Sequence, residues 1–198
     1  MNLIWWEKTV EYKFVMLLSK SNKLFLAPLD GNHERAGDTI LSSHNRWVLI
    51  EFKKDKSSIQ DEKTKFLKYE AAKSELGLID GHHHLIYGQL TNNNPQELAL
   101  CGETYFSKQA LRSLDEILSS GTGINEFSNY IKQFTKYKKS PRGGSGGGLA
   151  INDYSLVAGI NNDNKVVECF NLAEFQRSLG LELRQEQHLT RGYDGPSR

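Results

Sequence analysis

The chain has 198 residues, of which 38% are hydrophobic and 25% charged, and its formal net charge is +1. These values predict a soluble globular protein with one domain of ordinary size, or a core with an appendage. The small net charge excludes a global basic field, so any affinity for nucleic acid must come from local patches. The chain contains no run of ~20 apolar residues and no signal-peptide pattern, so we expect a cytoplasmic protein with no membrane partner. Cys101 and Cys169 are far apart in sequence and are expected to be reduced thiols.

A helix is predicted over residues 3–19, because apolar side chains recur there at helical spacing and gather on one half of the helical wheel. Glu7 and Glu11 lie within that apolar half. An unpaired buried carboxylate is costly, so we expect each to pair with a basic residue or to stay partly exposed beside the core.

Two short stretches predict strands after this helix. Residues 23–29 form the first, and residues 37–53 form a β-hairpin, because β-branched and aromatic flanks surround polar, turn-tolerant residues. With the turn at residues 44–45, antiparallel pairing sets Ile40 opposite Leu49.

The same register sets Asp38 opposite Glu51 and points Asp38, Glu51 and Lys53 to one face. Directly opposed carboxylates have Cβ atoms roughly 5 Å apart and repel each other. A divalent cation between them turns this repulsion into ligation, and oxygen ligands suit Mg²⁺ or Mn²⁺. The alternative is an amphipathic hairpin that carries a cluster of surface charges.

Asp38, a spacer and then Glu51-Phe52-Lys53 resemble the D…E-x-K signature of the PD-(D/E)XK nuclease superfamily, with Gly37 where the family name has Pro. The resemblance covers residues 1 to about 90. It implies an α/β fold of the restriction-endonuclease-like type, with a three-layer core of order α-β-β-β-α-β and a mixed sheet.

The resemblance also implies roles for individual residues. Asp38 and Glu51 would hold Mg²⁺ or Mn²⁺, and Lys53 would orient or deprotonate the attacking water and offset charge on the phosphate. In the family the first helix commonly carries a Glu that faces the metal. Either Glu7 or Glu11 suits this position, and Glu7 is favoured as a metal ligand because it lies nearer the centre of the apolar half.

A helix is predicted from about residue 58 to 76, with Ser57 and Gln60 as a capping box and Gly77 as its end. Residues 82–90 predict the next strand. The order helix, three strands, helix, strand agrees with the core of the resembling family. On that strand His82 and His84 share a face, and core or phosphate-contacting positions are favoured over metal ligation for these histidines.

Three further elements are predicted towards the C-terminus: a strand over residues 98–106, a helix from Ser107 to Leu118, and a helix from about Ile124 to Tyr137. A basic cluster without acids occupies the end of this helix and the residues after it, and it suits a phosphate backbone, although cations also suit a helix C-terminus. Its members are Lys132, Lys136, Lys138, Lys139 and Arg142.

The predicted domain plan has four parts. Residues 1–140 form the nuclease-like domain with added helices, and residues 141–148 form a glycine-rich flexible loop. Residues 149–182 form a C-terminal α+β extension, a hairpin and a helix that extend the sheet or dock on the core. Residues 183–198 are expected to be a frayed tail.

The expected function is a Mg²⁺-dependent endonuclease, acting on DNA more readily than RNA, in antiviral defence or repair. A protein partner or a homodimer would supply targeting, since the sequence contains no separate reading module. The alternatives are a catalytically silent domain of the same fold that binds nucleic acid or protein, and an unrelated interaction protein with surface charges at Asp38, Glu51 and Lys53.

Overall fold

The computed structural model describes residues 4–23, 45–93, 95–138, 155–172 and 174–180. Residues 172 and 174–180 are helical. In the described part of the chain, every helix is too short or too polar to cross a bilayer. The named elements are α1 (Glu7–Lys20), β1 (Arg46–Lys53), the 3₁₀-helix η2 (Ser57–Lys65), α2 (Tyr69–Leu76), β2 (His83–Leu90), β3 (Leu98–Thr104), β4 (Ala110–Leu111), α3 (Leu114–Ser119), α4 (Ile124–Tyr137), β5 (Ser155–Ile160) and β6 (Val166–Asn171).

The strands form one mixed sheet in the order β4-β3-β2-β1-β5-β6, so the protein belongs to the mixed α/β class. β1 and β2 are parallel, because η2 and α2 carry the chain back between them, and the other neighbours are antiparallel. The predicted C-terminal extension contributes β5 and β6 to this sheet.

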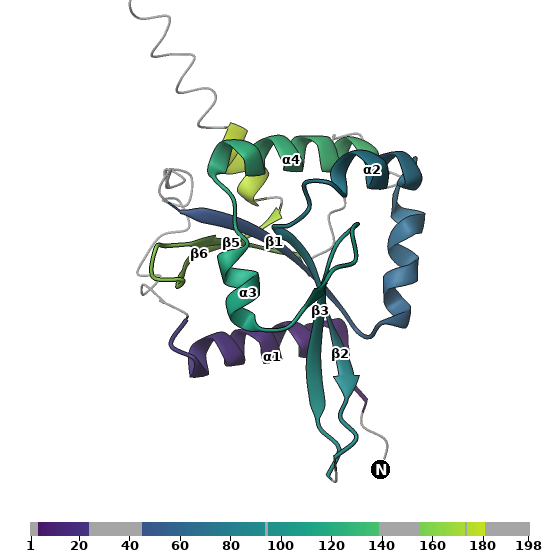
Figure 1. Ribbon diagram of the computed structural model, residues 1–198, viewed down its shortest axis with the longest axis vertical. Coiled ribbons are helices and arrows are strands. Elements are labelled where there is room, and N and C mark those ends of the chain that lie inside the picture. The colour runs from purple at the N-terminus through teal and green to yellow at the C-terminus, as the bar shows by residue number, and fades with distance from the viewer. Residues whose placement is uncertain (1–3, 24–44, 94, 139–154, 173, 181–198) are drawn as a thin grey trace, which may run out of the picture.

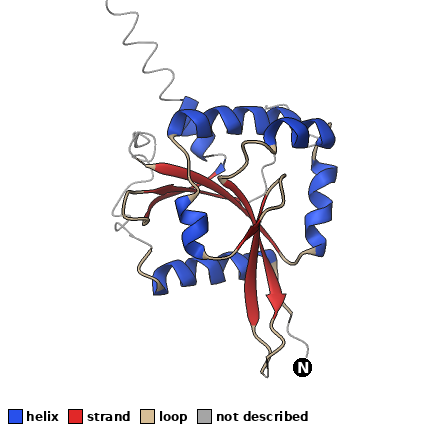
Figure 2. Ribbon diagram, in the orientation of Figure 1, coloured by secondary structure: helices blue, strands red, loops and turns tan. Residues whose placement is uncertain are grey.

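Helices cover both faces of the sheet (Figures 1 and 2). On β1, the side chains of Val48, Ile50 and Phe52 pack with α1 and α3 on one face. Trp47 and Leu49 point to the other face and pack with η2, α2 and α4. Because successive side chains alternate, Glu51 and Lys53 also face η2 and α4.

The predicted pairing within the hairpin of residues 37–53 is wrong. Leu49 is paired with His83 of β2 on one side and with Val157 of β5 on the other, so it has no free edge for Ile40. A strand buried on both faces reads as a nearly continuous apolar run, and that run does not reveal which strands flank it. Residues 23–29 are described only at Lys23, and residues 37–44 lie outside the described residues.

The single helix predicted over residues 58–76 is two helices. The chain leaves η2 at Phe66, which is buried, and the Leu67 N–H donates to the carbonyl oxygen of Tyr137 at 2.8 Å. The predicted capping box of Ser57 and Gln60 is wrong: η2 follows Lys56, and the Asp55 carboxylate accepts from the Ser58 N–H at 3.0 Å and from the Ser57 hydroxyl. The bond to α4 satisfies a backbone donor that a continuous helix would have used internally.

The helix predicted from Ser107 to Leu118 is present only in its second half, as α3, and its predicted start at Ser107 is wrong. Ser107 lies in a turn, and its hydroxyl donates to Asp80 at 2.7 Å, while the backbone N–H groups of Phe106 and Ser107 donate to the other Asp80 oxygen at 2.6 and 2.8 Å. The short strand β4 follows, and α3 begins after Ser113, whose side chain accepts from the Glu116 N–H. The Ser107 hydroxyl, which the local pattern predicts to cap a helix, therefore donates to the buried carboxylate of Asp80, which is distant in sequence.

Several predicted elements are confirmed. α4 has the predicted bounds and buries Phe127, Tyr130, Ile131 and Phe134. α1 begins at Glu7 rather than residue 3, because Trp6 is extended. The strands at 82–90 and 98–106, the hairpin strands β5 and β6 and the final helix are present near the predicted positions. Both cysteines are free thiols. The glycine-rich segment and the C-terminal tail lie outside the described residues.

We predict that Asp80→Ala lowers the free energy of unfolding by about 3 kcal/mol, because it leaves two backbone donors near the core without an acceptor. Urea unfolding followed by circular dichroism measures this loss. The control is Asp163→Ala in the exposed β5–β6 turn, which should change stability by less than about 0.5 kcal/mol. Equal, small effects of the two substitutions would contradict the structural role of Asp80.

Candidate functional site

Glu51 and Lys53 lie at the end of β1 and point to the same side of the sheet. Only 3% of Glu51 and 2% of Lys53 is exposed, and the Lys53 Nζ lies 3.6 Å from the Glu51 Oε2. The interpretation of these residues as surface charges is therefore wrong. They form the centre of a buried ion cluster, which we define as Glu51, Lys53, Glu62, Lys65 and Lys138.

Glu62 of η2 is the residue that sequence reasoning missed. Its Oε1 lies 2.7 Å from the Lys53 Nζ and also pairs with Lys65, and its Oε2 accepts from the Tyr105 hydroxyl at 2.6 Å. One signal in the sequence could have identified it. Ile59, Glu62 and Phe66 follow one another at spacings of three and four, so an acid occupies the apolar stripe of this segment.

Lys138 follows the last residue of α4 and closes the cluster. Its Nζ lies 3.3 Å from the Glu62 Oε2, 3.6 Å from the Glu51 Oε1 and 4.6 Å from the centres of the Phe66 and Phe134 rings. Flanking rings stabilise an ammonium group that is partly removed from water. Lys138 therefore points inward, although it was predicted to belong to a basic surface cluster.

The other members of that predicted cluster differ from Lys138. Lys132 and Lys136 are exposed on α4, while Lys139 and Arg142 lie outside the described residues.

His83 of β2 borders the cluster from the neighbouring strand. Its Nδ1 lies 2.8 Å from the Tyr130 hydroxyl, its ring stacks on that of Tyr105 at 4.1 Å, and its Nε2 lies 3.6 Å from the Glu51 Oε1. The Tyr105 ring and the Tyr130 hydroxyl fix the orientation of the imidazole, so the His83 Nε2 points towards Glu51.

Contacts within the cluster hold Glu51, Lys53 and Glu62 in their charged forms. Burial alone would raise the pKa of Glu51, but Lys138, His83 and Lys53 outweigh it and hold this pKa well below its ordinary value. Burial alone would lower the pKa of Lys53, but Glu51 and Glu62 raise it, with a smaller contribution from Glu7. The pKa of Glu62 is lowered because nearby lysines outweigh burial and the repulsion by Glu51. Glu51 is thus a carboxylate and Lys53 an ammonium group at neutral pH.

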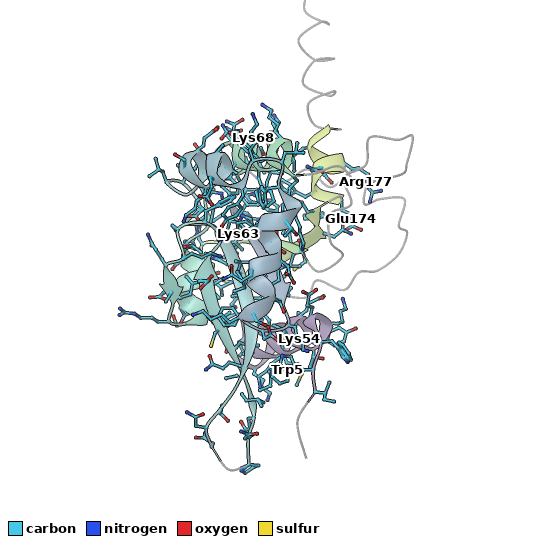
Figure 3. The ribbon with its side chains drawn as sticks, turned by 90° about the vertical axis from the view of Figure 1, so that its right-hand side faces the viewer. Trp5, Lys54, Lys63, Lys68, Glu174 and Arg177 are labelled. Atoms are coloured by element: carbon cyan, nitrogen blue, oxygen red, sulfur yellow. The ribbon has the colours of Figure 1, made fainter. Side chains whose placement is uncertain are left out.

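α1 brings Glu7 close enough to influence Lys53, and the residue before this helix's N-cap is bonded to the residue after β1. The Trp5 indole N–H donates to the Lys54 carbonyl oxygen at 2.6 Å (Figure 3). Gly88 of β2 leaves room for this contact, since a Cβ there would lie 2.5 Å from the Trp5 Nε1. Glu11 instead pairs with Lys8 at 2.9 Å on its own helix. Asp38 lies outside the described residues.

The described residues do not by themselves form a divalent-cation site. Among them, no group of three or more His, Cys, Asp or Glu side chains is arranged to hold a metal. Both Glu62 oxygens already have partners within hydrogen-bonding distance, whereas the cationic groups nearest to Glu51 lie at 3.6 Å, beyond the usual hydrogen-bond length of about 2.7–3.2 Å. Glu51 is therefore the carboxylate in the cluster that fits a metal ligand.

The neighbouring histidines serve the core. β2 begins at His83, and the prediction that His82 and His84 share a face is wrong. His82 packs against the Tyr130 ring of α4 at 4.6 Å. The His84 Nε2 lies 2.7 Å from the hydroxyl of Ser120, at the end of α3 on the other face of the sheet. Burial, with a smaller contribution from neighbouring histidines, lowers the pKa of His82 to about 4 and that of His84 to about 3.

Comparisons with protein-family models, curated proteins and solved structures find no match to this chain.

We predict that Glu62→Ala destabilises the protein by about 3–5 kcal/mol, because it leaves the buried ammonium groups of Lys53 and Lys138 without their closest carboxylate. Denaturant unfolding measures the change. The matched control is Glu70→Ala on the exposed side of α2, expected to be within about 0.5 kcal/mol of the wild type. A loss for Glu62→Ala no larger than that of the control would rule out a tightly coupled cluster.

We also predict a dependence of stability on pH. The folded-state pKa values of His82 and His84 lie below the ordinary value of 6.5, so the unfolded chain binds more protons and the free energy of unfolding falls as the pH drops from about 6.5 to about 4. Urea unfolding at several pH values measures this slope. His84→Gln should flatten it, and an unchanged slope would contradict the assignment.

Proposed function

We propose that this domain is a nuclease in which Glu51 and Lys53 belong to a metal-dependent centre that hydrolyses phosphodiester bonds, in DNA more readily than RNA. The observation that carries the proposal is the pair itself: a carboxylate and an ammonium group, two residues apart on one buried strand and both held ionised. Such fixed charges stabilise a transition state in which negative charge develops on phosphate oxygens.

The electrostatics favour one role for Lys53. Because its pKa is raised, the ammonium group keeps its proton and is a poor general base. Lys53 therefore acts as a fixed positive charge that orients the attacking water and offsets the charge on the phosphate. The alternative expectation, that Lys53 deprotonates the water, receives no support from its surroundings.

Glu51 would hold Mg²⁺ or Mn²⁺ together with Asp38, with Glu7 at the edge of the site. When bound, the cation supplies Lewis-acid activation of the phosphate and lowers the pKa of a coordinated water. Glu51 is ionised, as ligation requires, and its cationic neighbours at 3.6 Å are distant enough to be exchanged for a closer ligand.

The restriction-endonuclease-like architecture also belongs to this proposal. The succession α1, β1, η2 with α2, and β2 supports it, because β1 and β2 are parallel and β1 carries Glu51 and Lys53. A role in cytoplasmic defence or repair, with targeting by a partner or a homodimer, follows from the same resemblance and is part of the proposal.

A second candidate is a catalytically silent domain that binds nucleic acid. The burial of the cluster favours it, because Glu51 and Lys53 already neutralise groups within the protein. The cluster also pairs two carboxylates with three ammonium groups, an excess of positive charge that suits an anion better than an additional cation.

Cleavage assays with Mg²⁺ or Mn²⁺, with and without EDTA, distinguish the two candidates. Linear duplex, circular duplex, single-stranded DNA and RNA serve as substrates. The wild type should nick or cut at least one of them only when the metal is present. Lys53→Ala and Asp38→Asn should each lower the rate about 100-fold or more, because each removes a charge from the reaction centre.

Two controls accompany this assay. Asp163→Asn, in an exposed turn, should cut like the wild type, and circular dichroism should show that each variant is folded. If Asp38→Asn cuts at the wild-type rate, the proposed centre is wrong. If the wild type cuts none of the substrates, the silent domain becomes the better account.

A further inference from the structure

A cleft of about 400 Å³ opens between η2, the start of α2 and the turn that joins β3 to β4. Four lysines from these separate segments line it, namely Lys56, Lys63, Lys73 and Lys108. Lys63 lies on the side of the molecule seen in Figure 3, where Lys54 and Lys68 are also labelled. Convergence of cations from distant segments on one concave surface is the arrangement that concentrates a positive field.

The charge in this cleft is not balanced locally. Lys108 is paired with Glu103 at 3.0 Å, and Glu103 is the one acid among the described lining residues. Within the described chain, no carboxylate forms an ion pair with Lys56, Lys63 or Lys73. The interleaved acids of residues 57–76 thus do not cancel these three lysines inside the cleft.

An aromatic ring lies among the lysines. Tyr69 is half-buried, its ring is held by Phe66 at 5.5 Å and by Phe106 at 5.9 Å, and the Lys63 Nζ lies 5.5 Å from its centre. Positive grooves that carry aromatic side chains are the common means of holding single-stranded nucleic acid, because every base has a face that can stack.

The size of the cleft limits the kinds of ligand that it can hold. Its volume lies in the range of pockets that enclose one small ligand, roughly 300–1,000 Å³. A nucleotide fits such a space, whereas a duplex, whose major groove alone is about 12 Å wide, cannot enter it. An extended single strand is therefore the form of nucleic acid that can bring phosphates to all the lysines.

The cleft borders the buried ion cluster. The Lys108 Nζ lies 5.9 Å from the centre of the Tyr105 ring, and the Tyr105 hydroxyl donates to Glu62. Lys63 also follows Glu62 directly on η2. Tyr105 and η2 thus lie between the cleft lysines and the ion cluster.

We propose that this cleft binds a single-stranded segment of nucleic acid, with its phosphates on Lys56, Lys63 and Lys73 and a base against Tyr69. The identity of the ligand rests on the proposed nuclease function, which concerns the same molecule class. The cleft would hold the strand next to the ion cluster, in which Glu51 and Lys53 stay buried behind Glu62 and Tyr105. A single strand, or a duplex opened locally, is the bound form.

Fluorescence anisotropy with a short labelled oligothymidylate tests the proposal, with EDTA present so that binding is separated from cleavage. Lys63→Ala/Lys73→Ala should weaken binding roughly tenfold and lower the slope of log K against log salt by about 1.4, which is about 0.7 for each phosphate contact to a single strand. The matched control is Lys13→Ala/Lys20→Ala on α1, across the sheet, which removes the same charge and should leave the affinity within about twofold of the wild type.

The outcomes separate the two proposals. No loss for the cleft variant, an equal loss for the α1 variant, or equally tight binding of a duplex of the same length overturns the cleft assignment. Binding that depends on the cleft in a protein that cuts no substrate upholds the cleft and overturns the nuclease. If the cleft variant retains full metal-dependent cutting and unchanged binding, the nuclease proposal is upheld and the cleft proposal is overturned.

Discussion

The ammonium group of Lys53 is held between two carboxylates in the protein interior, 2.7 Å from Glu62 and 3.6 Å from Glu51. A buried charge without a partner costs several kcal/mol, so the elements that carry these groups must stay together. Lys138 extends the same constraint to the end of α4. This set of contacts joins β1, η2 and α4. The backbone hydrogen bond from Leu67 to Tyr137 also connects the end of η2 with the end of α4. Around it, the aromatic rings of Phe66, Tyr105 and Phe134 exclude water and strengthen each ion pair.

The cluster and the lysine-lined cleft are best understood together. The cluster fixes one carboxylate and one ammonium group in their ionised states, while three of the four cleft lysines, Lys56, Lys63 and Lys73, have no carboxylate partner among the described residues. The buried ring of Tyr105 lies between Lys108 of the cleft and Glu62 of the cluster. Lys138 is the more exposed of the cations around Glu51, with 17% of its side chain accessible against 2% for Lys53. Of these two cations, Lys138 is therefore the less costly one to move away from Glu51.

Sequence reasoning located the charged pair but not its surroundings. The E-x-K triplet identified Glu51 and Lys53, and alternation along a strand correctly put them on one face. The other members of the cluster come from separate segments. Glu62 lies in a segment rich in both charges, and Lys138 belongs to a run of lysines at a helix C-terminus that suits a phosphate backbone or solvent equally. The register of β1 could not be foreseen either, since an apolar central strand accepts any neighbour of suitable pattern. The fold prediction failed in the same way at Ser107, where the distant Asp80 took the hydroxyl.

The sequence by itself determined where most helices and strands lie, because apolar periodicity, caps and turns are local properties of the chain. It also determined that Glu51 and Lys53 share a side of their strand. Only the tertiary structure decided that β5 and β2 flank β1, that Glu62 and Lys138 complete the ion cluster, and that four lysines line one cleft. The physical reason is that ion pairing and strand pairing depend on distance in space, and residues such as Glu62 and Lys138 become neighbours only after the helices have packed on the sheet.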